Sequence, residues 1–349
     1  MLDVKELLRF GVNRGASDIH LMAKSPPLFR VDGKLEATSL EVLTPDETKK
    51  MIYALLNDQQ KQQFETELEL DFSFTVPELG RFRVNVHRQR GSVEAALRIV
   101  PSRIPTLPEL GLPIVIEEIV RRPGGLVLVT GAVGMGKTTT LAAMVDLLNQ
   151  EKQYLIISIE DPIEYVHTNR RSAVKQREVA SDTKSFASAL KHILRQDPNV
   201  VVIGEMRDLE TIATALTAAE TGHLVLATLH TQDAAQTVDR IIDVFPSQQQ
   251  QQIRIQLAST LQAVISQQLL PMKAGRGRVL GCEVMIATPA IRHLIREKET
   301  EQIPTLIQTG SQHGMQSMDR SLKELYRRGL VGLETVRDRV KDLQEFESL

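Results

Sequence analysis

The residues best suited to chemistry form a loop of the pattern G-x-x-x-x-G-K-T, which runs from Gly131 to Thr138. Glycines let backbone N–H groups come close to phosphate oxygens, and a helix that begins behind such a loop adds partial positive charge. We expect Lys137 to reach the β- and γ-phosphates and the Thr138 hydroxyl to ligate Mg²⁺. The loop therefore predicts a nucleoside triphosphate site, and the alternative is a glycine-rich turn without a ligand. The predicted nucleotide-binding residues are Gly131, Ala132, Val133, Gly134, Met135, Gly136, Lys137, Thr138 and Thr139.

The segments around this loop have the pattern of a strand followed by a helix. Leu126–Val129 is a short apolar run, and apolar residues after the loop follow helical spacing at positions 141, 144, 145 and 148. Three more apolar runs, separated by helix-like segments, occupy residues 155–159, 200–203 and 224–227. Strands that are apolar on both faces are covered by helices on both sides, so we expect an α/β fold with a parallel sheet. From about residue 245 onward the pattern predicts helices.

Polar residues follow these runs where each predicted strand ends. Glu160, Asp161 and Glu164 come after the second run, Glu205 after the third and His230 after the fourth. Parallel strands present their carboxyl ends at one edge of the sheet, where ligands of such sheets bind. We therefore expect these side chains to converge on the phosphate loop.

Each of these side chains has a chemical interpretation and a structural alternative. Glu205 can activate the attacking water or hold Mg²⁺, and its alternative is an ion pair with Arg207. His230 can form a hydrogen bond to the γ-phosphate and report its loss, and its alternative is a satisfied core or edge histidine. Asp161 and Glu164 are expected to hold the metal through water. The predicted metal ligands are Thr138, Asp161, Glu164 and Glu205.

Residues 1–100 have the pattern of a separate α+β domain. A hairpin is predicted at Asp32-Gly33, a helix start at Thr44-Pro45 and a half-exposed strand over Gly80–Arg88. Prolines crowd residues 101–113, which therefore predict a linker. The second domain covers residues 114–349, with C-terminal helices from about residue 288.

The composition excludes several classes of protein. The chain has 42 basic and 44 acidic residues and a formal charge of −2, so it lacks the basic field of a nucleic-acid binder. Aromatic residues make up only 4%, which leaves a helicase few platforms for stacking single strands. No N-K-x-D motif for reading guanine occurs, so a GTPase is not expected.

The same sequence indicates where the protein works. The single cysteine, Cys282, excludes an internal disulfide and a Cys₄ zinc site, and it fits a reducing cytosol. No apolar run reaches the roughly 18 residues that span a bilayer, and the N-terminus lacks the pattern of a signal peptide. We expect a cytoplasmic protein without a transmembrane segment, which partners carry to a membrane if it works at one.

Several motifs together resemble those of a known family. The run ILRQDPNVVVIGEMRD, with IEDPIE before it and TGHLVLATLHT after it, resembles the Walker B, Asp-box and His-box set of secretion-type hexameric ATPases. The octapeptide AIRHLIRE at residues 290–297 and the opening GASDIH at residues 15–20 are similar to signatures of the type IV pilus retraction ATPases, the PilT family. The resemblance covers essentially the whole chain. It implies a PAS-like N-terminal domain, a RecA-like P-loop NTPase domain and a homohexamer that hydrolyses Mg-ATP to power pilus disassembly and twitching motility.

The resemblance also implies partners and further site residues. The expected partners are the inner-membrane platform protein at the pilus base and other pilus ATPases. The family uses its N-terminal domain to complete a neighbour's site, so we expect Arg81, Arg83 and Arg98 to act in trans as arginine fingers. The alternative for arginines on a wet strand face is that they are simply solvated. With these residues the predicted catalytic set is Glu205, Lys137, His230, Arg81, Arg83 and Arg98.

The chain departs from the family pattern at four positions. Ala132, Val133 and Met135 stand in the phosphate loop where the family usually has Pro, Thr and Ser, and His293 replaces the Asn of the C-terminal signature. Because backbone N–H groups hold the phosphates, we expect nucleotide binding to persist with altered kinetics. The segment after Thr288 also has an independent interpretation as an amphipathic helix packed on the core.

Two other functions remain as alternatives. A pilus extension or type II secretion ATPase of the same superfamily commonly carries a further N-terminal domain and a tetracysteine zinc motif. Here about 100 residues precede the predicted linker and one cysteine is present. The second alternative is a weakly catalytic accessory partner that binds nucleotide, which the intact Lys137, Thr138 and Glu205 disfavour.

Overall fold

The computed structural model describes residues 3–31, 33–100, 103–275 and 277–340. The chain divides into two compact units, and it passes from the first to the second between Arg103 and Ile104. The segment Glu164–Val166 groups with the first unit. Pro101, at the start of the predicted linker, lies outside the described residues, whereas Leu107 and Leu112 are buried in the core of the second unit.

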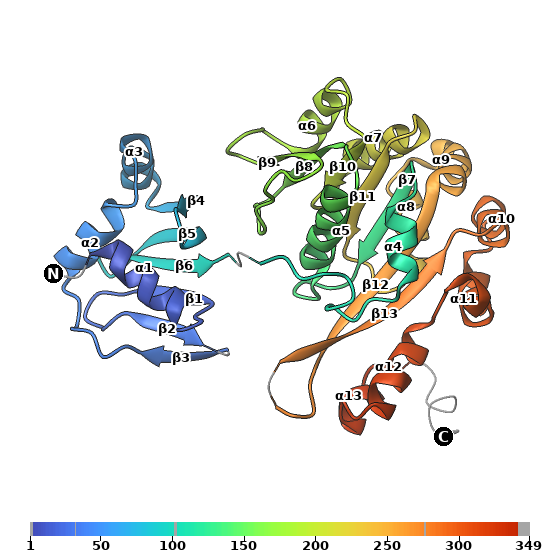
Figure 1. The fold of residues 1–349 in the computed structure, drawn as a ribbon. Helices are drawn as coiled ribbons and strands as arrows, with labels where there is room; N and C mark the ends of the chain where they lie inside the picture. The colour runs from blue at the N-terminus through green and yellow to red at the C-terminus, as the bar shows by residue number, and fades with distance from the viewer. Residues whose placement is uncertain (1–2, 32, 101–102, 276, 341–349) are drawn as a thin grey trace. The chain divides into compact units, whose positions relative to one another are not determined.

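The first unit contains an antiparallel sheet of six strands in the order β3-β2-β1-β6-β5-β4, together with three helices (Figure 1). Its strands are β1 (Asp18–Leu21), β2 (Leu28–Val31), β3 (Lys34–Ala37), β4 (Glu69–Val76), β5 (Gly80–Gln89) and β6 (Ser92–Ile99). Its helices are α1 (Val4–Asn13), α2 (Pro45–Tyr53) and α3 (Asp58–Glu67). Leu7 of α1, Phe64 of α3 and Phe82 of β5 are fully buried in one cluster, so helices and sheet share a single core.

The predicted helix start and the predicted hairpin of this unit are both present in the structure. Thr44 and Glu47 form a reciprocal capping box at the start of α2, and Pro45 is its first residue. Strands β2 and β3 pair with Val31 opposite Lys34, which confirms the hairpin, although Asp32 lies outside the described residues.

The second unit contains a sheet of seven strands in the order β13-β12-β7-β11-β10-β8-β9. Neighbouring strands are parallel except for β12 and β13, which form an antiparallel hairpin. The strands are β7 (Gly125–Thr130), β8 (Leu155–Glu160), β9 (Ala173–Glu178), β10 (Val200–Ile203), β11 (Leu224–Leu229), β12 (Leu261–Pro271) and β13 (Arg278–Ile286). The four predicted strands and the α/β class with a parallel sheet are confirmed.

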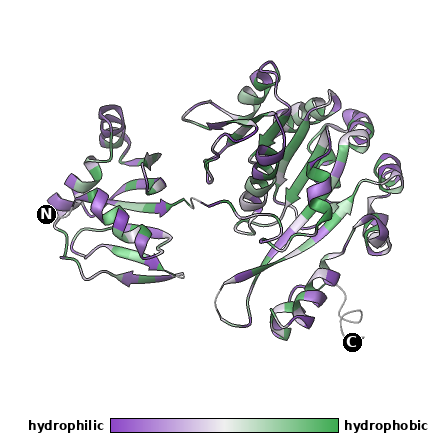
Figure 2. Ribbon diagram, viewed as in Figure 1, coloured by the Kyte–Doolittle hydropathy of each residue, from purple (hydrophilic) through white to green (hydrophobic). Residues whose placement is uncertain are grey.

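Helices cover both faces of this sheet (Figure 1). One face carries α4 (Val115–Val120) and α5 (Lys137–Glu151), and the other carries α6 (Phe186–Ile193), α7 (Leu209–Glu220), α8 (Ala234–Asp243) and α9 (Ser247–Thr260). Right-handed crossovers require this division, because the chain moves across the sheet in one direction from β7 to β9 and in the opposite direction from β9 to β12. Strands β7, β10 and β11 are buried along their whole length, and Figure 2 shows them as apolar ribbons among helices with polar outer faces.

The prediction of helices from about residue 245 onward is wrong for residues 261–271 and 278–286, which form β12 and β13. The buried strand β12 contains polar residues that form hydrogen bonds to other buried side chains. Ser266 Oγ accepts a hydrogen bond from Thr130 at 2.9 Å, and Gln267 Nε2 donates to Thr140 at 2.7 Å. These polar residues obscure the strand pattern, since a polar position usually marks an exposed face. The mostly polar strand β9, at the edge of the sheet, is also absent from the prediction.

The C-terminal part is helical from residue 289, in agreement with the prediction. Helix α10 (Pro289–Glu297) has Thr288 as its N-cap and buries Ile291, Leu294 and Ile295, so its interpretation as an amphipathic helix packed on the core is confirmed. The remaining elements are η1 (Thr300–Gln302), α11 (Ile303–Thr309), η2 (Gly310–His313), α12 (Met318–Arg327) and α13 (Leu333–Arg337). None of the helices in the described ranges is both long and apolar enough to cross a membrane.

Candidate nucleotide site

The glycine-rich segment forms a loop between β7 and α5 at the carboxyl edge of the sheet. Gly131, Gly134 and Gly136 have φ angles of 140°, 79° and 81°, which favour glycine. At Gly131 an added Cβ would lie 2.5 Å from the carbonyl oxygen of Gln267, so glycine lets the loop approach β12. At Gly134 nothing lies within 4 Å of an added Cβ. The backbone therefore has the shape of a phosphate loop that leads into a helix N-terminus.

Lys137, the first residue of α5, is only 8% exposed. Its Nζ donates to the carbonyl oxygens of Gly131 at 2.7 Å and Ala132 at 2.9 Å, and it lies 3.4 Å from Nδ1 of His230. A buried ammonium group is costly unless it is hydrogen-bonded, so these oxygens hold it inside the loop. The loop thereby places a cation where phosphate oxygens can accept its hydrogen bonds.

Glu205, two residues beyond the end of β10, is bound by two other side chains. Its Oε1 lies 2.8 Å from Nε2 of His230, and Arg207 donates to both of its oxygens, from Nε at 2.6 Å and from Nη2 at 2.7 Å. Partial burial acts to raise the pKa of Glu205, but the hydrogen bonds and charges of Arg207 and His230 lower this pKa below its ordinary value. Glu205 is therefore a carboxylate at neutral pH, and the ion pair considered as its structural alternative is present.

His230, directly after β11, connects Glu205 to Lys137. Its Nε2 lies 2.8 Å from Oε1 of Glu205 and its Nδ1 lies 3.4 Å from Nζ of Lys137, so the ring bridges the two side chains. The structure thus brings three of the predicted catalytic residues into one chain of contacts at the sheet edge.

The predicted metal ligands are not gathered in the same way. Thr138 is the second residue of α5, Asp161 is exposed directly after β8, and Glu164 is exposed in the segment that groups with the first unit. Among the residues that the structure describes, no group of three or more His, Cys, Asp or Glu forms a metal cluster. Mg²⁺ in phosphate sites usually takes one or two carboxylates plus substrate phosphates, so it does not require such a cluster.

The β12–β13 hairpin, which the sequence analysis missed, contacts the phosphate loop. The N–H of Leu269 donates to Sδ of Met135 at 3.2 Å, and Nη1 of Arg278 donates to the carbonyl oxygen of Gly134 at 3.3 Å. Met135, one of the departures from the family pattern, therefore joins the loop to the hairpin. The apolar run Ala263–Ile265 and the glycines before Arg278 are the signals in the sequence that indicate a hairpin here.

The predicted arginines lie on β5 and β6 of the first unit. Arg83 is opposite Arg98 in the register of the two strands, and Nε of Arg98 donates to Oδ1 of Asp18 at 2.9 Å. Arg81 instead donates to Ser73. An open pocket of about 270 Å³ is lined by Asp18, Asp71, Arg83, Asn85, Ala96 and Arg98. The structure therefore groups Arg83 with Arg98 in one pocket that does not include Arg81.

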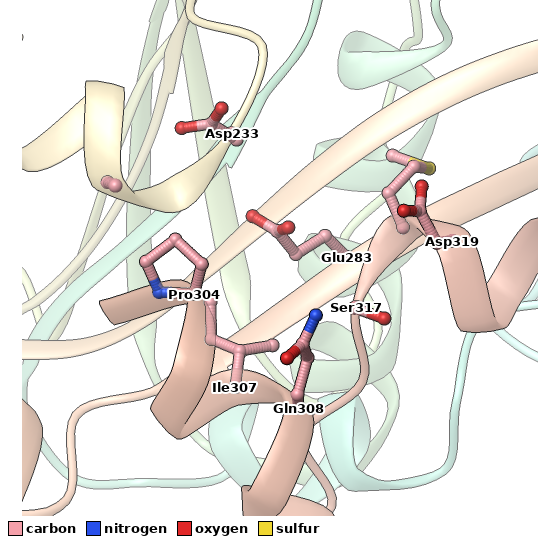
Figure 3. A pocket seen from close by; sticks show the side chains of 9 residues that line it. Asp233, Glu283, Pro304, Ile307, Gln308, Ser317 and Asp319 are labelled. Carbon is pink, nitrogen blue, oxygen red and sulfur yellow. The ribbon is translucent and has the colours of Figure 1, made fainter. Parts of the chain in front are cut away.

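A smaller pocket of about 140 Å³ lies apart from the phosphate loop, between β13, α11 and the starts of α8 and α12 (Figure 3). Its carboxylates serve helix ends. Asp233 is the N-cap of α8, Glu283 accepts the N–H of Ala234 at 2.8 Å, and Asp319 lies in the first turn of α12. Because pockets for small-molecule ligands measure about 300–1,000 Å³, this one is too small for a nucleotide.

Comparison with known proteins shows to which family the chain belongs. A family described as "Type II/IV secretion system protein" matches residues 3–338. The chain is 50% identical over 345 residues to the type IV pilus retraction ATPase PilT of Pseudomonas aeruginosa, with 99% of this chain and 100% of that protein covered. The chain belongs to the PilT family of type II/IV secretion ATPases. A twitching motility protein of Neisseria gonorrhoeae is 45% identical, covering 97% of this chain and 91% of the relative.

A solved structure of this family has the same fold. The crystal structure of the pilus retraction motor PilT with bound ADP matches with a TM-score of 0.94 and 49% identity over 100% of both chains. Family membership, predicted from the motifs alone, is therefore confirmed.

We predict that Gly131→Ala weakens nucleotide binding much more than Gly134→Ala does. Both positions have a positive φ, so alanine costs about 1–2 kcal/mol at each. Only at Gly131 would the added Cβ also meet a backbone carbonyl, which forces the loop away from β12. We expect the affinity for fluorescent ADP to fall at least about tenfold more in Gly131→Ala than in Gly134→Ala, a difference of about 1.4 kcal/mol. Equal losses in the two variants would contradict this account of the loop.

Proposed function

We propose that the chain is a Mg²⁺-dependent ATPase motor that powers type IV pilus retraction, and hence twitching motility, as a homohexamer. The observation that carries this proposal is the chain of contacts from Lys137 through His230 to Glu205, at the carboxyl edge of a parallel sheet. ATP hydrolysis requires a cation on the phosphates and a group that orients the attacking water. The 50% identity to the retraction ATPase PilT connects this chemistry to the pilus.

The residues of the site fit ATP and Mg²⁺. The loop offers backbone N–H groups and a helix N-terminus to phosphate oxygens. Thr138, Asp161 and Glu205 offer the hard oxygen ligands that Mg²⁺ prefers. When bound, Mg²⁺ would supply neutralisation of the charge that develops on the phosphates.

In the mechanism that we propose, Lys137 exchanges the carbonyl oxygens of Gly131 and Ala132 for the β- and γ-phosphates. Glu205 orients the attacking water and accepts its proton, and the lowered pKa keeps this carboxyl group in its basic form at neutral pH. His230, which contacts both residues, changes partners when the γ-phosphate leaves. Loss of one phosphate thereby changes the hydrogen bonds at the ends of two strands.

We further propose that the first unit is PAS-like, that the second is RecA-like, and that neighbouring copies share sites. Arg83 and Arg98 present N–H donors on one face of the first unit, and Asp18 holds Arg98 in place. Offered to a neighbour's γ-phosphate, these donors would stabilise its developing charge as arginine fingers do. Arg81 is a weaker candidate because it is bonded to Ser73. Closure and release around the ring would then displace a bound partner.

The proposed place of work is the cytoplasmic side of the inner membrane. Attachment there would come through the platform protein at the pilus base, and other pilus ATPases are further candidate partners. The alternative of a pilus extension or type II secretion ATPase is disfavoured by the 50% identity to PilT over its whole length. The alternative of a weakly catalytic accessory protein is disfavoured by the contacts of Lys137, His230 and Glu205.

We predict that Glu205→Gln binds ATP but hydrolyses it at least about a hundredfold more slowly, because an amide cannot accept the proton of water. Steady-state phosphate release and the affinity for fluorescent ADP measure the two properties. Glu210→Gln, with the same change in charge on the exposed start of α7, is the control and should keep normal turnover. Normal hydrolysis by Glu205→Gln would end its assignment as the base.

The arginines are tested in the same assay. Arg83→Ala and Arg98→Ala should lower turnover strongly, by about 10³-fold if they act as fingers, while nucleotide binding within each protomer persists. Arg88→Ala, at an exposed position of β5, the strand that contains Arg83, is the control. Unchanged turnover in both variants would show that this face is merely solvated.

The cellular function is tested by deleting the gene and imaging pili. We expect pili to form but not to retract, because assembly does not depend on a retraction motor. The wild-type gene should restore retraction, whereas the Glu205→Gln gene should not. A strain without pili would favour the extension alternative instead.

A further inference from the structure

Arg207 places a positive charge on the carboxylate that is proposed to serve both the water and the metal. It lies two residues after Glu205 in the loop that follows β10, and its guanidinium group binds both oxygens of Glu205, at 2.6 Å and 2.7 Å. Such forked pairs are the strong form of a carboxylate hydrogen bond. The carboxylate therefore has a cation of this chain at hydrogen-bond distance from both of its oxygens.

A second carboxylate adds to the field around this cation. The hydrogen bonds and the charge of Glu205 raise the pKa of Arg207, and the charge of Asp161 raises it further. Asp161 and Glu205 follow neighbouring strands, β8 and β10, and both are proposed metal ligands. Arg207 thus responds to the same two negative charges that would attract Mg²⁺.

The surroundings of Arg207 allow its side chain to leave. The side chain is 66% exposed, against 18% for that of Glu205, and within the described part of the chain Glu205 is the only group to which it is bonded. The backbone beside it is fixed, because Met206 is buried and its N–H donates to the carbonyl oxygen of Thr228 at 3.1 Å. Release of the guanidinium group therefore breaks one ion pair and requires no change of fold.

We propose that Arg207 is an internal counter-ion of the metal site, which holds Glu205 while Mg²⁺ is absent and which Mg²⁺ entering with the nucleotide must displace. The inference rests on the proposed Mg-ATP function. Two cations cannot share one carboxylate at hydrogen-bond distance without strong repulsion, so binding of one opposes binding of the other. Arg207 therefore reduces the gain in nucleotide affinity that Mg²⁺ produces. It also occupies the oxygens of Glu205, and so keeps them from water, until the metal binds.

The opposite role would leave a different signature. If Arg207 permanently positioned Glu205 for catalysis, its removal would lower turnover but would not increase the gain in nucleotide affinity that Mg²⁺ produces. The two roles are therefore separated by an equilibrium measurement that involves no hydrolysis.

The experiment measures the dissociation constant of the fluorescent nucleotide MANT-ADP in EDTA and in saturating Mg²⁺. The value in EDTA is divided by the value in Mg²⁺, so a larger ratio means that Mg²⁺ increases the affinity for the nucleotide more strongly. The ratio reports the coupling between metal and nucleotide. A substitution that only changes the general attraction of the protein for the anionic nucleotide alters both dissociation constants by the same factor, which cancels in the ratio. We expect Arg207→Gln to increase this ratio about three- to tenfold relative to wild type. Arg207→Lys keeps the charge and should stay near wild type, as should Arg195→Gln, a control that removes a charge from an exposed position.

Two results would overturn the inference while leaving the proposed function intact. These are an unchanged or smaller ratio in Arg207→Gln, and an equal increase in Arg195→Gln, in each case with normal binding by the wild type. Failure of the wild-type protein to bind MANT-ADP in either condition would instead refute the proposed function, and the inference with it. Thermal melting of each variant confirms that it is folded, which the exposure of Arg207 leads us to expect.

Discussion

A buried ammonium group that needs oxygen partners organises the second unit. Lys137 is almost inaccessible to solvent, so the carbonyl oxygens of Gly131 and Ala132 must take the place of water around it. The loop can fold back on its lysine because Gly131 meets the carbonyl oxygen of Gln267 without an intervening side chain. Strands β7 and β12, side by side in the sheet, therefore fix the loop, and the loop fixes the cation.

The same sheet also holds His230, which contacts this cation, and Glu205, which contacts His230. Thr228 Oγ1 donates to the carbonyl oxygen of Gly204 at 2.5 Å, and the backbone N–H of Met206 donates to the carbonyl oxygen of Thr228, so the loop after β10 is joined to the end of β11. Glu205 lies in this loop, and His230 directly follows β11. Their separation is set by backbone contacts as well as by their own hydrogen bond. A change of ligand charge at such a site moves side chains before it moves strands.

The features that could be predicted from the sequence are those that depend on residues close together in it. The phosphate loop, the four buried strands and the capping box at Thr44 depend on residues a few positions apart, and the structure has all of them. Strand β12 could not be predicted in this way. Its polar residues Ser266 and Gln267 form hydrogen bonds to Thr130 and Thr140, which lie 136 and 127 positions away. A pattern of apolar residues cannot show that a polar residue has a buried partner so distant in sequence.

The arginines show the same limit at a functional face. Alternation in β5 correctly places Arg81 and Arg83 on one face, but the register with β6 and β1 decides their partners. That register sets Asp18 opposite Arg98, so the GASDIH motif, seen in the sequence only as a resemblance, acquires a physical role. Asp18 is 9% exposed and binds one edge of a guanidinium group whose side chain is 68% exposed. An arginine held in this way loses less freedom when it meets an anion. The ion pair that restrains Arg98 would therefore also favour the proposed contact with a neighbour's phosphate.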